Sequence, residues 1–233
     1  MTASERLIVA LDVAALAQAR RLARQLTGLA RTLKVGSALF TACGPEAVRT
    51  LRALGFDIML DLKFFDIPST VEASCRAAAA HRVSLLTVHA AGGRAMLEAA
   101  VAGARAGAAR AGAPRPKVLA VTVLTSSGDG SGASVRARVL RLAQAALQAG
   151  CDGVVASAQE AAALRRRFGR RLEVVCPGIR PAHAASRQDQ RRGGTPRDAL
   201  ARGASRLVIG RPITGARRPR AAAQRILHEM EGF

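Results

Sequence analysis

The chain has 233 residues, 49% of them hydrophobic, so it can bury a substantial core as one large α/β domain or as two small ones. No apolar run reaches the roughly 18 residues that a membrane span needs, which predicts a soluble protein. The formal net charge is +20 at pH 7, and a field of that sign attracts phosphates of every kind.

A chain this basic could bind nucleic acid, but the distribution of its arginines argues against that as the main function. Of the 36 basic residues only three are lysines, and the arginines fall mostly in segments of helical period such as RRLARQL and RRRFGRRL. Tyr and Trp, whose rings would stack on single-stranded bases, are absent. We therefore expect no nucleic acid partner, although a small anionic substrate would still benefit from the field.

The N-terminal segment and the cysteines indicate a cytoplasmic protein. The segment MTASERLIVALD has no basic leader before a long apolar stretch and no cleavage pattern of small residues. The four cysteines lie far apart without paired spacing, which favours reduced, buried thiols over disulfides or a zinc site.

Short apolar runs recur along the chain between Ala-, Leu- and Arg-rich segments of helical period. Continuous apolar runs of this length are typical of parallel strands buried on both faces, and the helical segments supply the crossovers. The eight predicted strands span residues 7–13, 32–36, 57–64, 85–90, 118–125, 153–157, 173–179 and 206–212. They predict an α/β fold, a single-domain (β/α)8 TIM barrel, with one catalytic domain over residues 1–233 and no internal linker.

Polar residues stand at the carboxyl ends of these strands, where barrels of this class hold their active sites. Asp61 and Lys63 lie two apart on the third strand, so strand alternation predicts that both side chains face inward. Buried charges of either sign are costly unless they are paired. The Asp and Lys residues of the first three strands therefore predict a network in which the two charges alternate. The alternative is a cluster of ion pairs that only closes the top of the barrel and has no catalytic role. The polar residues at the strand ends are Asp12, Lys34, Asp61, Lys63, Asp66, His89, Thr125, Ser157, Arg180 and Arg211.

The last two strands predict a phosphate site. Gly-Ile-Arg at 178–180 follows the seventh strand, and Gly-Arg-Pro at 210–212 follows the eighth. Loops after these strands commonly bind phosphate through glycine amides. Arg211 can hold phosphate oxygens with two donors, and Gly210 lets the backbone approach closely.

Three further features are less specific. The Gly- and Ser-rich stretch at 126–134 predicts a mobile flap over the barrel mouth, with a flexible turn as the alternative. His89 is either a catalytic base or a packed, hydrogen-bonded histidine, and the second is more common. Lys117 precedes the fifth strand at the opposite end of the barrel, so we expect no catalytic role for it.

The order of the motifs resembles the orotidine 5'-phosphate decarboxylase family, from Leu7 to about Ala216. LIVALD, LKVG, VHAAGG, VTVLTS, DGVVAS, PGIR, DQRR and IGRPIT fall in family order. Related barrel enzymes of sugar phosphates share D-x-K-x-x-D, but the added DIP-x-TV, PGIR and DQRR favour the nucleotide enzyme. The family pattern D-x-K-x-x-D-I-P-x-T-V stands here as Asp61, Lys63, Asp66, Ile67, Pro68, Thr70 and Val71.

The resemblance implies decarboxylation of orotidine 5'-phosphate to uridine 5'-phosphate, the last step of de novo pyrimidine nucleotide synthesis. It implies that Lys63 donates the proton to ring carbon 6, with Asp61 against the departing carboxylate and Lys34 completing the charged array. Asp66 and Thr70 are implied to reach the neighbouring subunit's site, which predicts a homodimer with shared active sites. No metal-ligand cluster appears, so we expect no cofactor and no metal.

The resemblance also implies the groups that bind the nucleotide. The ribose hydroxyls are assigned to Asp12 and Lys34, and the pyrimidine to one of two loop serines, Ser126 or Ser127. The phosphate and the rest of the nucleotide are assigned to Gln190, Gly210, Arg211, Arg180 and Thr125.

Two positions depart from the family pattern. Ser69 and Thr87 stand where members often carry asparagine, and we expect these changes to affect local shape and flap dynamics and not the charged array. Two rival functions stay open: a magnesium-dependent sugar-phosphate lyase or decarboxylase on the same barrel, and a nucleic-acid-binding protein on an inactive barrel.

Overall fold

Eight parallel strands form a closed barrel in the computed structural model, which describes residues 1–124, 132–181 and 194–232. Each strand pairs with the next, and β1 closes the ring by pairing with β8, Leu7 opposite Leu207. The strands are β1 (Leu7–Ala10), β2 (Thr32–Gly36), β3 (Asp57–Phe64), β4 (Leu85–His89), β5 (Lys117–Val121), β6 (Gly153–Val155), β7 (Glu173–Cys176) and β8 (Arg206–Ile209). The predicted TIM barrel is confirmed, with all eight strands in the predicted order.

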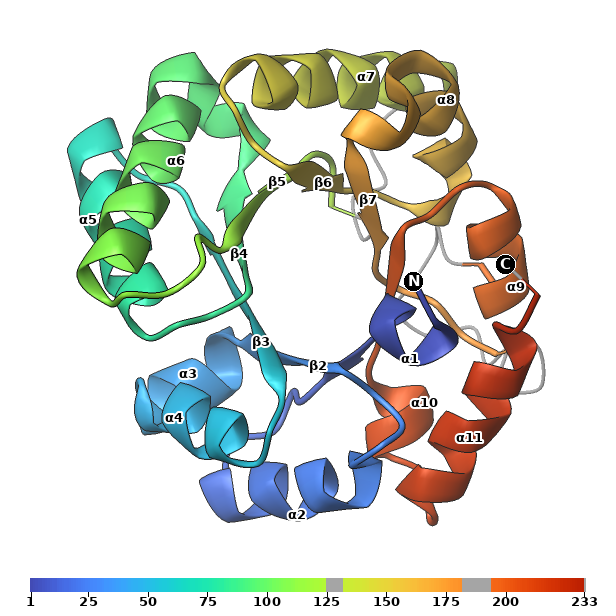
Figure 1. Ribbon diagram of the computed structural model, residues 1–233. Helices are drawn as coiled ribbons and strands as arrows, with labels where there is room; N and C mark the ends of the chain where they lie inside the picture. The colour runs from blue at the N-terminus through green and yellow to red at the C-terminus, as the bar shows by residue number, and fades with distance from the viewer. Residues whose placement is uncertain (125–131, 182–193, 233) are drawn as a thin grey trace.

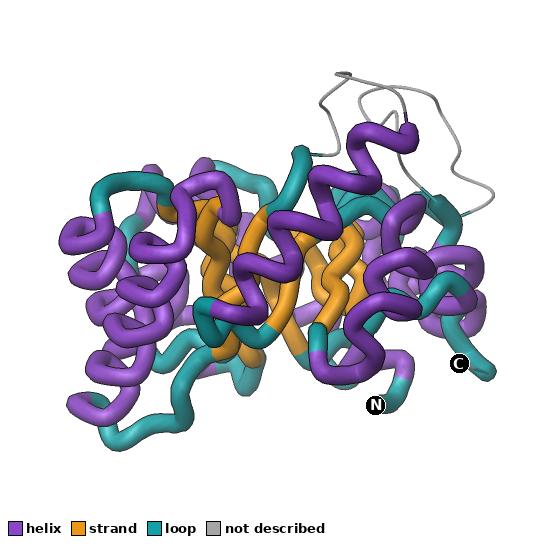
Figure 2. The backbone as a smooth tube through the Cα atoms, turned by 90° about the horizontal axis from the view of Figure 1, so that it is seen from above, coloured by secondary structure: helices purple, strands orange, loops and turns teal. Residues whose placement is uncertain are grey.

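Helices surround the strands on the outside of the ring (Figure 1), and the view at 90° shows the strands as a middle layer between them (Figure 2). The described helices are α1 (Ala3–Arg6), α2 (Leu16–Leu26), α3 (Ser37–Cys43), α4 (Glu46–Ala53), α5 (Pro68–Ala80), α6 (Gly93–Arg110), α7 (Gly132–Gln148), α8 (Ala158–Phe168), α9 (Pro196–Ala201), α10 (Arg211–Thr214) and α11 (Pro219–Glu229), with short 3₁₀ turns η1 (Ala90–Gly92) and η2 (Gly169–Arg171). None of them is long and apolar enough to cross a membrane.

Several strands end earlier than the sequence predicts. The first was expected to reach residue 13 and ends at Ala10, and the seventh was expected to reach 179 and ends at Cys176. Pro177 and Pro212 follow β7 and β8 closely, and proline has no N–H to donate to the next pair of a strand ladder. The residues beyond the ends are therefore released from the sheet to line the barrel mouth.

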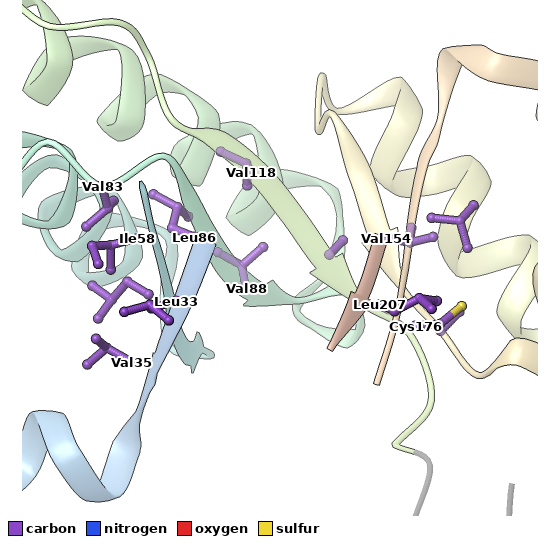
Figure 3. Close-up of a cluster of buried hydrophobic side chains, with 14 of the residues drawn as sticks. Leu33, Val35, Ile58, Val83, Leu86, Val88, Val118, Val154, Cys176 and Leu207 are labelled. Atoms are coloured by element: carbon purple, nitrogen blue, oxygen red, sulfur yellow. The ribbon is translucent and has the colours of Figure 1, made fainter. Parts of the chain in front are cut away.

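Two apolar cores follow from the alternation of side chains along each strand. Outward-facing residues such as Leu33, Ile58 and Val118 pack under the helices (Figure 3). A second, smaller cluster fills the barrel itself, and consists of Ile8, Ala10, Met59, Leu85, Leu119, Val121, Val155, Val175 and Val208. These inward residues form the floor beneath the polar groups at the carboxyl ends of the strands.

The four cysteines are unpaired, and Cys75, Cys151 and Cys176 are buried while Cys43 is half-buried. Burial raises the pKa of Cys75, Cys151 and Cys176 to about 12, so these thiols are protonated at neutral pH. The cysteines are unpaired, as predicted, and Cys43 is less buried than expected.

Helices α5 and α6 lie side by side (Figure 1), and glycine permits their close approach. A Cβ on Gly107 would lie 2.1 Å from the carbonyl oxygen of Arg76. We expect Gly107→Ala to lower the free energy of unfolding by about 1–3 kcal/mol, because the rigid backbone of α5 must move and this outweighs the better helix propensity of alanine. Urea denaturation measures the change. Gly132→Ala is the control, since a Cβ there meets nothing within 4 Å, and equal stability of both variants with the wild type would contradict the packing argument.

Candidate active site

A cavity of about 490 Å³ lies at the carboxyl ends of the strands. Six charged residues line it, drawn from the ends of β1, β2, β3, β7 and β8: Asp12, Lys34, Asp61, Lys63, Arg180 and Arg211. Its remaining wall is largely apolar, with Met59, Val121, Val155 and Val208 rising from the barrel interior. The cavity therefore presents charged groups beside a surface suited to a flat, uncharged ring.

The four charged residues of the first three strands form one continuous array. The ammonium of Lys34 lies 2.9 Å from Asp12 Oδ1 and 3.4 Å from Asp61 Oδ2. The ammonium of Lys63 lies 2.9 Å from the same Asp61 oxygen. Carboxylates and ammoniums thus alternate, as the sequence predicted, and Asp61 is shared by both lysines.

Asp61, at the centre of the array, stays charged although it is buried. Lys34 and Asp61 are only 8% and 9% exposed. Burial by itself would raise the pKa of the Asp61 carboxyl, but the charges of Lys34 and Lys63, with hydrogen bonds from Lys63 and Thr87, outweigh it and lower that pKa below its usual value. Asp61 is therefore ionised at neutral pH, and the site holds a fixed pattern of charge before any substrate enters.

Gly36 makes room for this array. It lies two residues after Lys34 on β2, and a Cβ there would lie 2.9 Å from Lys34 Nζ and 3.1 Å from Asp12 Oδ1. Any larger residue would push the ammonium away from Asp12. Strand alternation places Gly36 on the same face as Lys34, but the sequence does not show that the Lys34 ammonium and Asp12 lie so close to it.

The backbone at Lys63 is not that of a regular strand, although its side chain contacts Asp61. Its φ is +52°, in the left-handed region that non-glycine residues rarely adopt, and the pairing of β3 with β4 shifts register between Leu60 and Phe64. Such backbone costs on the order of 1–3 kcal/mol and persists where surrounding contacts hold it. The prediction that Asp61 and Lys63 meet is correct, but the regular strand on which it rested is interrupted by a bulge.

Thr87 belongs to the array, contrary to the prediction that it affects only local shape. Its side chain is fully buried on β4, and its Oγ1 accepts a hydrogen bond from the Lys63 amide (2.9 Å) and donates one to Asp61 Oδ1 (3.0 Å). The sequence showed a threonine in an apolar run, and only the pairing of β3 with β4 brings its hydroxyl to these two residues.

Asp66 and Thr70 lie apart from the cavity of their own chain. Asp66 is exposed, and its Oδ1 accepts a hydrogen bond from the amide of Ile67 at 2.6 Å, immediately before Pro68 begins α5. Phe65 and Ile67, on either side of Asp66, are 61% and 63% exposed. Both predicted cross-subunit residues thus stand on an open surface with an apolar border.

Arg180 and Arg211, which follow β7 and β8, also line the cavity. The Arg180 amide donates to the carbonyl of Gly194 at 3.1 Å, and this contact ties Arg180 to the segment that precedes α9. Gly210 lines the cavity next to Arg211. The predicted phosphate-binding residues of these two strands therefore line the same cavity as the Asp-Lys array.

The remaining predicted site residues fall into two groups. Thr125, Ser126, Ser127 and Gln190 lie outside the described residues, as does the predicted flap up to residue 131, while residues 132–134 begin α7. Ser157 is buried and caps α8 by accepting from the Gln159 amide at 3.2 Å, and it does not line the cavity. Among the described residues, no group of three or more His, Cys, Asp or Glu side chains is arranged to hold a metal ion.

His89 and Lys117 have structural contacts. The ring of His89 is half-buried with its centroid 5.5 Å from that of Phe65, and burial, then the charge of Lys63, lowers the pKa of the imidazole. Lys117 lies at the start of β5 and pairs with Glu173 at 2.6 Å at the opposite end of the barrel from the cavity. The predicted position of Lys117 away from the site is confirmed.

A parallel (β/α)8 barrel with an alternating Asp-Lys array and two arginines at the carboxyl ends of its strands defines a barrel enzyme for a small anionic substrate. The sequence profile described as the orotidine 5'-phosphate decarboxylase / HUMPS family matches residues 5–226. The chain belongs to this family, which confirms the resemblance in its motifs.

Similar proteins carry the same name over nearly the full length of the chain. An orotidine 5'-phosphate decarboxylase of Moorella thermoacetica is 48% identical over 238 residues, covering 99% of this chain and 94% of the relative. One of Halorhodospira halophila is 51% identical over 231 residues, covering 97% and 95%. The crystal structure of orotidine 5'-phosphate decarboxylase from Lactobacillus acidophilus matches with a TM-score of 0.82 at 37% identity, covering 98% of this chain and 100% of that chain.

Proposed function

We propose that the chain decarboxylates orotidine 5'-phosphate to uridine 5'-phosphate, the last step of de novo pyrimidine nucleotide synthesis, without a cofactor. The observation that carries this proposal is the buried Asp61 carboxylate between Lys34 and Lys63, in a cavity with an apolar wall that two arginines also line. The names of the relatives support the nucleotide as substrate over the sugar phosphates that the family also covers.

In the proposed reaction the bond between ring carbon 6 and the carboxylate breaks, and its electron pair stays on carbon 6. The Lys63 ammonium donates its proton to that carbon as carbon dioxide leaves, and afterwards regains a proton from water. The developing negative charge has no neighbouring carbonyl to receive it, so its stabilisation comes from the fixed positive charge of Lys63, which Asp61 holds in place at 2.9 Å.

The charged residues of the cavity also indicate where the other parts of the nucleotide bind. We assign the ribose hydroxyls to Asp12 and Lys34, because a carboxylate and an ammonium joined at 2.9 Å offer an acceptor and a donor side by side. We assign the phosphate to Gln190, Gly210 and Arg211, because a guanidinium group binds phosphate oxygens through two parallel donors and a glycine lets the backbone approach closely. We assign Arg180 and Thr125 to the lining of the nucleotide site, and the pyrimidine to one of the serines at 126 and 127.

We propose a homodimer in which each subunit completes the other's site. Asp66 and Thr70 do not line their own cavity, and the exposed side chains of Phe65 and Ile67 border them. An exposed apolar pair around a carboxylate is suited to a protein interface. We propose a cytoplasmic enzyme whose partner is a second copy of the chain, with no nucleic acid partner.

The test is the fall in ultraviolet absorbance as orotidine 5'-phosphate becomes uridine 5'-phosphate, measured with EDTA present. We expect full turnover in EDTA, because the proposed mechanism uses only side chains. Loss of activity in EDTA and its recovery with magnesium would instead favour the metal-dependent sugar-phosphate reactions. Sugar phosphates assayed under the same conditions serve as the control substrates, and turnover of these alone would overturn the proposal.

A further inference from the structure

We propose that Thr87 is a positioning residue of the active site, whose single hydroxyl fixes both the backbone of Lys63 and the carboxylate of Asp61. This inference rests on the proposed function, since it concerns the placement of the proton donor. Thr87 itself is not among the residues that line the cavity, so it acts through these two neighbours.

The chemistry of the three groups determines the direction of both hydrogen bonds. An amide N–H can only donate, and the ionised Asp61 carboxylate can only accept. The Thr87 hydroxyl has one hydrogen and two lone pairs, so it accepts from the Lys63 amide at 2.9 Å and donates to Asp61 Oδ1 at 3.0 Å. The Thr87 side chain is fully buried, so both contacts are shielded from bulk water.

The first hydrogen bond replaces one that the sheet has lost. Because the β3–β4 register shifts between Leu60 and Phe64, the Lys63 amide falls outside the regular ladder. A partly buried amide without a partner is unfavourable, so the hydrogen bond to the Thr87 hydroxyl supports the left-handed backbone at Lys63. That backbone directs the ammonium to Asp61.

The second hydrogen bond orients the carboxylate. Thr87 holds Asp61 Oδ1, which leaves Oδ2 to face both lysines at 2.9 and 3.4 Å. A rotated carboxylate would pull Lys63 away from the place where the proton is needed. Displacement of a catalytic group by about 1 Å costs about 10²-fold in rate, because the reacting atoms are then misaligned.

The experiment compares Thr87→Val, which keeps the shape and removes the hydroxyl, with Thr87→Ser, which keeps the hydroxyl. We expect kcat to fall about 10²-fold in Thr87→Val with KM within about threefold of the wild type, and Thr87→Ser to recover most of the rate. The matched control is Thr122→Val: Thr122 is also buried, but its hydroxyl donates to the Val155 carbonyl at 2.9 Å and contacts no charged group. It should keep the wild-type kcat.

Three results would overturn the inference: an unchanged kcat in Thr87→Val, a loss in Thr87→Ser as large as in Thr87→Val, or an equal loss in Thr122→Val. Should Thr87→Val not fold, Thr87→Ala makes the same comparison.

A wild type that does not turn over orotidine 5'-phosphate would refute the proposed function separately. A crystal structure of the valine variant then tests the positioning role without turnover: we expect Lys63 to lose its positive φ or its contact with Asp61, and retention of both would refute it.

Discussion

Replacing Lys63 with alanine is expected to lower kcat for orotidine 5'-phosphate by about 10⁴-fold or more, since the change removes a general acid and a fixed positive charge at once. The fold should survive, because Asp61 keeps Lys34 at 3.4 Å and the hydrogen bond from Thr87 as compensation for its buried charge. The measurement is the absorbance assay at saturating substrate, with thermal unfolding recorded for each variant.

Lys63→Arg separates the two roles of this residue. Arginine keeps the positive charge beside Asp61 but does not release a proton near neutral pH, so we expect its kcat to remain far below that of the wild type while its stability is close to it. Lys117→Ala is the matched lysine control, because Lys117 lies at the opposite end of the barrel. Wild-type turnover by Lys63→Ala would remove Lys63 from the mechanism.

Mixing inactive Asp61→Ala and Asp66→Ala proteins is expected to restore about one quarter of the wild-type activity. At equal amounts half of the dimers are mixed, and in each of these one site combines the intact Asp61 of one chain with the intact Asp66 of the other. The second site of the same dimer lacks both carboxylates. Subunit exchange followed by the absorbance assay measures the recovery.

A matched mixture shows whether such recovery is specific. Asp61→Ala mixed with Lys63→Ala should stay inactive, because both changes fall in the array of a single chain and no mixed dimer contains an intact site. If Asp66 acted in its own subunit, the mixture of Asp61→Ala and Asp66→Ala would stay inactive too. That result would remove the cross-subunit role from the proposal.

The sequence predicted the barrel well because each strand is a short apolar run between helical segments, and parallel strands buried on both faces require such runs. It predicted the charged residues of the cavity for a related reason: Lys34 and Asp61 lie within strands that are largely apolar and Asp12 follows one, and an unpaired charge there would be costly. It was less accurate at the carboxyl ends of β1, β5 and β7, where the chain leaves the sheet earlier than its composition suggests.

The contacts that complete the array could not be read from local pattern. Thr87 looked like one more β-branched residue of a strand, and Gly36 like a strand terminus. Their importance depends on contacts between side chains: the Thr87 hydroxyl meets Lys63 and Asp61 of the neighbouring strand β3, and Gly36 leaves space for the Lys34 ammonium of its own strand beside Asp12. Register between strands is set by the packing of the whole barrel, which no single segment encodes.

By itself, then, the sequence determined the order of the eight strands, the residue types at their carboxyl ends and the family to which they correspond. Only the tertiary structure decided how those residues meet: the bulge that turns Lys63 toward Asp61, the hydroxyl of Thr87 that supports it, and the outward position of Asp66. The physical reason is that composition and periodicity report the burial of each segment, whereas hydrogen bonds between buried polar groups depend on distances of about 3 Å between residues far apart in the chain.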